Sequence, residues 1–77
     1  MNMIPVTSTN IKTIGYDPAA RTLRVQFNSG GTYDYTEVPE ATWHDFAASA
    51  SKGQFFVKEI KGKYQSTKTG ISVEQAG

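Results

Sequence analysis

The chain has 77 residues, a net charge of +1, one histidine and no cysteine. This length predicts a single domain whose core is too small to enclose a deep enzyme pocket. The missing thiols exclude disulfides and thiolate metal ligands, and no apolar run approaches the length of a membrane span.

The charge is distributed unevenly along the chain. Residues 1–51 carry three basic and five acidic side chains, whereas residues 52–77 carry five lysines and two glutamates. An acidic partner for the second segment is one interpretation, and a solvated helix face is the other. The N-terminus lacks the basic start and apolar run of a secretory signal. We therefore expect a cytoplasmic protein, in the host cytoplasm if it is phage-encoded.

Alternating apolar and polar residues in the first half predict an antiparallel meander of about three to four strands. Two short strands are expected at residues 4–8 and 11–16. Residues 22–27 form the clearest strand, because Leu, Val and Phe alternate there with polar residues. Turn residues at 28–31 then lead into a strand at 32–36, whose two tyrosines lie opposite the preceding strand.

A first amphipathic helix is predicted after this meander. Pro39 suits the first helical turn, where its missing N–H is not needed. The side chains expected to face the sheet from this helix are Trp43, Phe46, Ala47 and Ala50.

A second helix is predicted from Ser51 to about Tyr64. Ser51 and Gln54 have the spacing of a capping box. Phe56, Ile60 and Tyr64 recur at four-residue intervals, which places them on one face.

The predicted fold is therefore α+β, with the antiparallel meander packed against two short C-terminal helices in one domain over residues 1–64. Residues 65–77 are polar apart from Ile71 and Val73, so we expect a mobile tail.

The sequence contains no recognisable catalytic or metal-binding pattern. His44 precedes Asp45, but neighbouring helix positions do not face each other. Ser51 is better explained as a helix cap than as a nucleophile, since no base is near it in sequence. A zinc site cannot be assembled from one histidine and no cysteine. We expect a protein that is not an enzyme and that needs no cofactor or metal.

A set of short motifs resembles the KTSC domain, a family named for its occurrence at the C-terminus of some lysyl-tRNA synthetases. The resemblance covers about residues 6–64 and rests on Ile14-Gly15-Tyr16-Asp17, Leu23-Arg24-Val25-Gln26-Phe27, Gly30, Tyr33-Asp34-Tyr35, Val38-Pro39, Ser51-Lys52-Gly53, Phe55-Phe56, Ile60 and Tyr64. It implies a small bacterial or phage protein without an assigned activity. The family pattern commonly has asparagine in place of Val57 and arginine in place of Lys61.

Two functions remain open from the sequence. In the first, RNA or DNA phosphates contact a lysine cluster and a base stacks on Tyr33, Tyr35 or Phe55. In the second, the domain is a protein-interaction module, for example a phage or bacterial protein that binds and modulates a host protein, with Phe55 as an anchor. Phe55 could instead cover the margin of the sheet. The candidate site residues are Lys52, Phe55, Lys58, Lys61 and Lys63.

Overall fold

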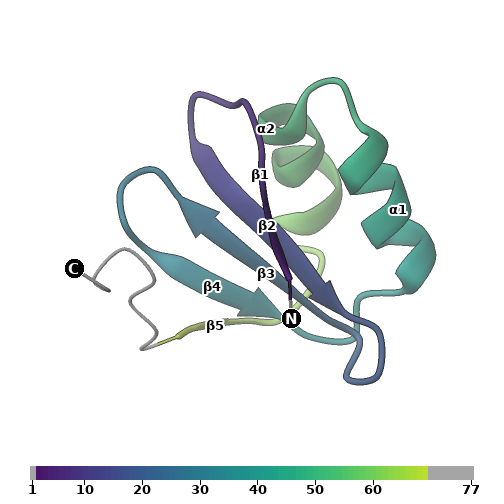
Figure 1. Ribbon diagram of the computed structural model, residues 1–77. Helices are drawn as coiled ribbons and strands as arrows, with labels where there is room; N and C mark the ends of the chain where they lie inside the picture. The colour runs from purple at the N-terminus through teal and green to yellow at the C-terminus, as the bar shows by residue number, and fades with distance from the viewer. Residues whose placement is uncertain (1, 70–77) are drawn as a thin grey trace.

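The computed structural model describes residues 2–69, which form a five-stranded antiparallel sheet in the order β1-β2-β3-β4-β5 with helices on one face (Figure 1). The elements in chain order are β1 (Met3–Pro5), β2 (Ile11–Asp17), β3 (Thr22–Phe27), β4 (Thr32–Tyr35), α1 (Glu40–Ala48), α2 (Lys52–Phe55), the π-helical turn η1 (Phe56–Ile60) and β5 (Ser66–Lys68). The predicted α+β class and the meander are confirmed.

The sheet has one strand more than the sequence predicts. β5 pairs with β4, with Tyr35 opposite Ser66 and Tyr33 opposite Lys68. All three residues of β5 are polar and exposed, so no alternation marks this strand in the sequence. These residues fall in the segment predicted as a tail; its residues 70–77, with Ile71 and Val73, lie outside the described residues.

The first strand is shorter than predicted because Ser8 belongs to a turn. Its hydroxyl accepts hydrogen bonds from the backbone N–H groups of Asn10 and Ile11, both at 3.3 Å. Such local bonds compete with strand pairing and are typical of Ser in turns. Residues 7–10 therefore form a loop that leads into β2.

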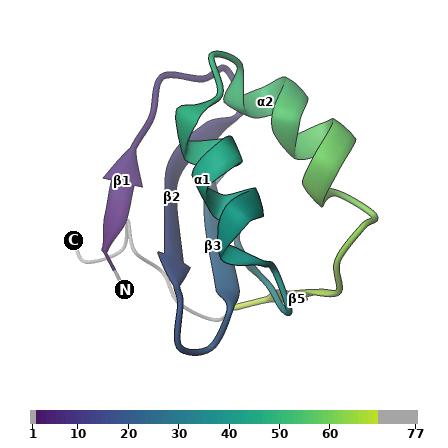
Figure 2. The same cartoon turned by 90° about the vertical axis from the view of Figure 1, so that its right-hand side faces the viewer.

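The helices cover one face of the sheet, and the core lies between the two layers (Figure 2). The Tyr16 hydroxyl donates to the Val38 carbonyl at 2.5 Å, and the Val38 N–H donates to the Arg21 carbonyl at 2.9 Å. These bonds fix the segment between the sheet and α1. The buried core residues are Ile11, Ile14, Tyr16, Leu23, Val25, Tyr35, Val38, Phe46, Phe56 and Ile60.

The predicted inner face of α1 is wrong in part. Phe46 is fully buried, and Trp43 is half-buried with its ring stacked on Tyr16 at 5.6 Å. Ala47 is exposed, and Ala50 is exposed beyond the end of the helix. The two aromatic rings fill the available interface, so the smaller alanine side chains do not reach the sheet.

The second helix ends four residues earlier than predicted, and its capping box is absent. Ser51 is the N-cap residue, but no side-chain cap bond forms there. Ser51 instead exchanges hydrogen bonds with the Ser49 hydroxyl at 3.0 and 3.1 Å. The helix ends at Ile60, and Gly62 then takes a φ of +78°, a turn conformation that glycine favours. Tyr64 therefore packs on the core from the following loop.

Alkaline pH is expected to destabilise the fold through Tyr35. Burial, assisted by the nearby Tyr33, raises the pKa of Tyr35 above its usual value of 10.0. A raised folded-state pKa means that the stabilising contribution is complete below pH 10 and is lost as the pH rises through the folded pKa. The urea midpoint of Tyr35→Phe should therefore fall less steeply above pH 10 than that of the wild type. Parallel curves for the two proteins would contradict this assignment.

Candidate functional site

The described surface is hollowed by a groove between the β1–β2 loop, the β3–β4 turn and the segment formed by α2 and η1. Two adjoining cavities of about 440 and 530 Å³ make up this groove. We name the first the apolar pocket and the second the lysine pocket, after the side chains that distinguish them. Their shared wall consists of Thr9, Asn10, Gly53 and Val57.

Asn28 holds one side of the groove in place. Its side-chain amide donates to the carbonyls of Ser8 and Thr9 at 3.2 and 3.0 Å. The backbone N–H of Asn28 also donates to the Asn10 carbonyl at 2.8 Å. The β1–β2 loop is thus tied to the β3–β4 turn, so the groove wall is formed before any ligand arrives.

Three of the five predicted site residues line the groove. Lys52 and Lys58 line the lysine pocket, and Lys61 lines the apolar pocket. Lys52 is half-buried and its Nζ donates to the Ser49 carbonyl, whereas Lys58 and Lys61 are exposed. No acidic side chain of the described residues lines either pocket, so the three positive charges are not neutralised within the groove.

The other two predicted site residues lie outside the groove. Phe55 is half-buried, and its ring stacks on Phe46 with centroids 5.4 Å apart. Lys63 is exposed in the loop after η1 and lines neither pocket. The two tyrosines considered for base stacking pack within the domain instead. Tyr35 is buried, and the Tyr33 ring contacts the Phe27 ring edge-on.

Sequence reasoning missed Asn10 and Val57. Val57 is 59% exposed, which is unusual for a large apolar side chain in so small a domain, and it lines both pockets. Asn10 also lines both pockets, and its side-chain amide makes no hydrogen bond among residues 2–69. Two signals for Val57 were available: it interrupts the lysine-rich face of the second helix, and it stands where the family pattern commonly has asparagine.

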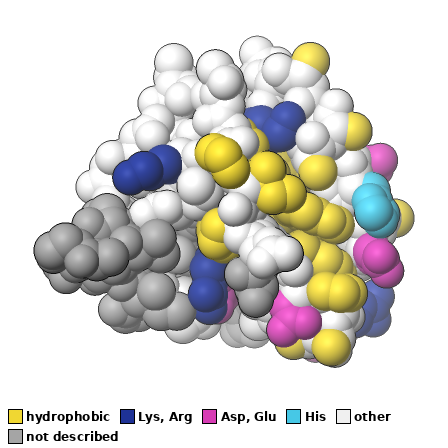
Figure 3. Space-filling view, in the orientation of Figure 1, with side chains coloured by type: hydrophobic (Ala, Val, Ile, Leu, Met, Phe, Trp, Pro, Cys, Tyr) yellow, Lys and Arg dark blue, Asp and Glu magenta, His cyan; other side chains and the backbone are white. Residues whose placement is uncertain are grey.

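Acidic side chains gather elsewhere, along the right edge of Figure 3 over α1. His44 belongs to this edge and lies 3.5 Å from Glu40, with most of its side chain exposed. Residues 2–69 contain no cluster of His, Asp and Glu that could hold a metal ion. Within the same residues no helix is long and apolar enough to cross a membrane.

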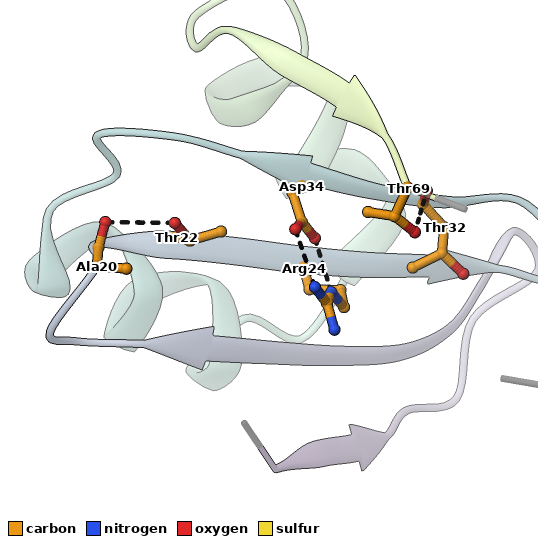
Figure 4. A network of polar contacts seen from close by, with 6 residues as sticks. All are labelled: Ala20, Thr22, Arg24, Thr32, Asp34 and Thr69. Carbon is orange, nitrogen blue, oxygen red and sulfur yellow. Dashed lines mark hydrogen bonds and ion pairs between the residues drawn. The ribbon is translucent and has the colours of Figure 1, made fainter. Parts of the chain in front are cut away.

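The sheet face away from the helices carries a neutralised ion pair. Figure 4 shows Arg24 and Asp34 pointing toward each other from β3 and β4. Arg24 Nε and Nη2 donate to the two Asp34 carboxylate oxygens at 2.7 and 3.0 Å. The hydrogen bond to Asp34 raises the pKa of Arg24 above its usual value, against the opposing effect of burial. This arginine is therefore committed to the fold, which leaves the groove as the candidate site.

Comparisons with known proteins give one family. Its model, described as the KTSC domain, matches residues 7–64. A protein of Tsukamurella paurometabola is 40% identical over 63 residues, covering 82% of this chain and 94% of that protein. The crystal structure of a KTSC domain protein from Yersinia pestis has a TM-score of 0.87 and 46% identity, and it covers 90% of this chain and 97% of that chain.

Some relatives are much longer proteins. The lysine–tRNA ligase of Nostoc punctiforme is 42% identical over 55 residues, which is 71% of this chain but only 10% of the ligase. A ligase of a second Nostoc strain matches over the same length at 40% identity.

Proposed function

The chain belongs to the KTSC domain family, and we propose that it is a non-catalytic module that binds RNA or DNA through the lysines of the groove. One observation carries the proposal: Lys52, Lys58 and Lys61 line two adjoining cavities, and no acidic side chain of the described residues lines either of them. Lysines without local counter-charges attract phosphates. The acidic edge over α1 would turn away from such a ligand, which orients the domain on it.

The relatives support a nucleic-acid ligand. A domain like this one forms about a tenth of several lysine–tRNA ligases, enzymes whose name gives a tRNA substrate. A small module that binds RNA and is attached to such an enzyme would add contacts to that tRNA. The same binding chemistry in this chain would act on cytoplasmic RNA or DNA, so a cytoplasmic location is part of this proposal.

The test is the salt dependence of binding to a labelled single strand, measured by fluorescence anisotropy. Each phosphate contact displaces condensed counterions, so the logarithm of the affinity should fall with the logarithm of salt by about 0.7 per contact. Replacing Lys58 and Lys61 together by glutamine should flatten this slope by about 1 to 1.5 units. Both side chains are exposed, so the melting temperature should not change.

The matched control is the double variant Lys63→Gln and Lys68→Gln. It removes the same charge from two exposed positions that line neither pocket, and it should leave the slope unchanged. If both double variants flattened the salt slope equally, binding would depend on the net charge of the domain and not on the lysines of the groove. If wild type bound neither RNA nor DNA at low salt, the proposal would fail, and a protein-interaction module would be the better account.

A further inference from the structure

We infer that the groove seats one unpaired nucleotide, with its base in the apolar pocket and its phosphate in the lysine pocket. This inference rests on the proposed function and names the form of nucleic acid that the groove takes. It follows from the different chemistry of two cavities that share one wall.

The apolar pocket has the lining that a nucleobase needs. Ile11, Phe27, Phe56 and Val57 line it with apolar side chains, of which Ile11 and Phe56 are buried, and Thr9, Asn10, Asn28 and Ser29 contribute uncharged polar groups. Lys61 also lines this pocket and is exposed, so its ammonium group can contact the phosphate of a neighbouring nucleotide. Phe27 and Phe56 meet edge-to-face with centroids 5.3 Å apart, which keeps both rings in fixed orientations. The cavity volume of about 440 Å³ lies within the range of small-ligand pockets, about 300–1,000 Å³. A flat ring with polar edges suits this combination.

The lysine pocket has the lining that a phosphate needs. Its only large apolar side chain is Val57 on the shared wall, and its charged side chains are Lys52 and Lys58. The contact between Lys52 Nζ and the Ser49 carbonyl limits the positions of that ammonium group. Lys58 is exposed and can adjust to the ligand. One restrained and one exposed positive charge line the same cavity.

Asn10 lies where the base and phosphate pockets meet. Its amide carries both a donor and an acceptor, and neither is used within residues 2–69. The Asn28 amide, by contrast, already donates to two carbonyls of the β1–β2 loop. We therefore assign Asn10 as the side chain that contacts an edge of the base, and Asn28 as a positioning residue for the loop.

A base inside a duplex cannot enter the apolar pocket without leaving its stack. Unstacking and unpairing one nucleotide costs a few kcal/mol. A free-energy difference of about 1.4 kcal/mol corresponds to a tenfold difference in affinity. The same strand should therefore bind at least about tenfold more tightly when single than when paired with its complement. RNA and DNA both supply a base and a phosphate. Each sequence is therefore assayed as RNA and as DNA, so that the affinities for the two nucleic acids can be compared.

Two groove variants test the assignment in the anisotropy assay at low salt. Val57→Asp places a carboxylate on the wall shared by both pockets and should weaken single-strand binding by at least about tenfold. Asn10→Ala should weaken it by about three- to tenfold, the value of one hydrogen bond, with the salt slope unchanged. Ala47→Asp is the control, since it adds the same charge at an exposed position of α1 outside the groove.

The outcomes separate this inference from the proposed function. Equal binding of single strand and duplex, with the slope still flattened by Lys58→Gln and Lys61→Gln, would overturn the seated nucleotide but keep a nucleic-acid module. If a folded Asn10→Ala variant bound the single strand with unchanged affinity, the assignment of Asn10 as the side chain that contacts the base would be wrong. The inference is supported only if the single strand is preferred and Val57→Asp weakens binding more than Ala47→Asp does.

Discussion

Phe46→Ala is expected to abolish cooperative folding. Phe46 is the one fully buried large side chain of α1, so its truncation removes the deepest contribution of that helix to the core. Truncating a buried phenylalanine costs about 3–5 kcal/mol. A single core in a chain of this length supplies about the same amount in total. Thermal unfolding followed by far-ultraviolet circular dichroism should show no sigmoidal transition for this variant.

Phe55→Ala is the matched comparison for this prediction. Its ring stacks on Phe46 but is only half-buried, so less apolar surface returns to water and the domain should stay folded. A loss of about 4–8 °C in melting temperature corresponds to 1 kcal/mol in a domain of this size. If Phe46→Ala melted within a few degrees of wild type, the helix would not be anchored through this ring.

The strands could be predicted from the sequence because their signals are local. In β3, alternation alone places Leu23 and Val25 in the core, and both are fully buried. The turn after Phe27 fixes the pairing of β3 with β4, and the observed register puts Tyr33 and Tyr35 opposite these residues as predicted. Neither inference required knowledge of contacts between residues far apart in the sequence.

The second helix could not be predicted correctly because its geometry departs from the α-helical period. The Lys61 N–H donates to the Phe56 carbonyl at 2.8 Å, a bond spanning five residues where an α-helix spans four. Phe56 and Ile60 still reach the core, but the helix ends before Tyr64 can follow them. Projection of a regular helix therefore misplaced the last residue of the stripe.

The candidate site could be predicted only in its charges. The spacing of Lys58 and Lys61 indicates a shared helix face, and both lysines line the groove. The opposite wall comes from a loop near residue 10, whose approach to α2 depends on the Asn28 amide. Phe55 was predicted as a site residue, but its ring packs on Phe46, since a domain this small needs its large side chains for the core.

Arg24→Ala is expected to destabilise the domain without affecting the groove. Arg24 and Asp34 are directly opposite in the β3–β4 register, and their side chains are 22% and 20% exposed. A hydrogen bond between charged groups contributes about 1.5–3 kcal/mol, and truncating the arginine leaves the Asp34 carboxylate partly buried without its partner. Urea unfolding should show a loss of this size.

A double-mutant cycle with Asp34→Ala isolates the pair from the individual truncations. The double variant should lose less stability than the two single variants together, since each single change already breaks the same two bonds. Added salt should reduce this coupling only slightly, because the pair is mostly withdrawn from water. Additive losses would mean that the pair contributes no coupling to the fold. A change in nucleic-acid affinity at constant folding would instead place this sheet face within the binding surface, because the Arg24–Asp34 pair lies outside both pockets of the groove.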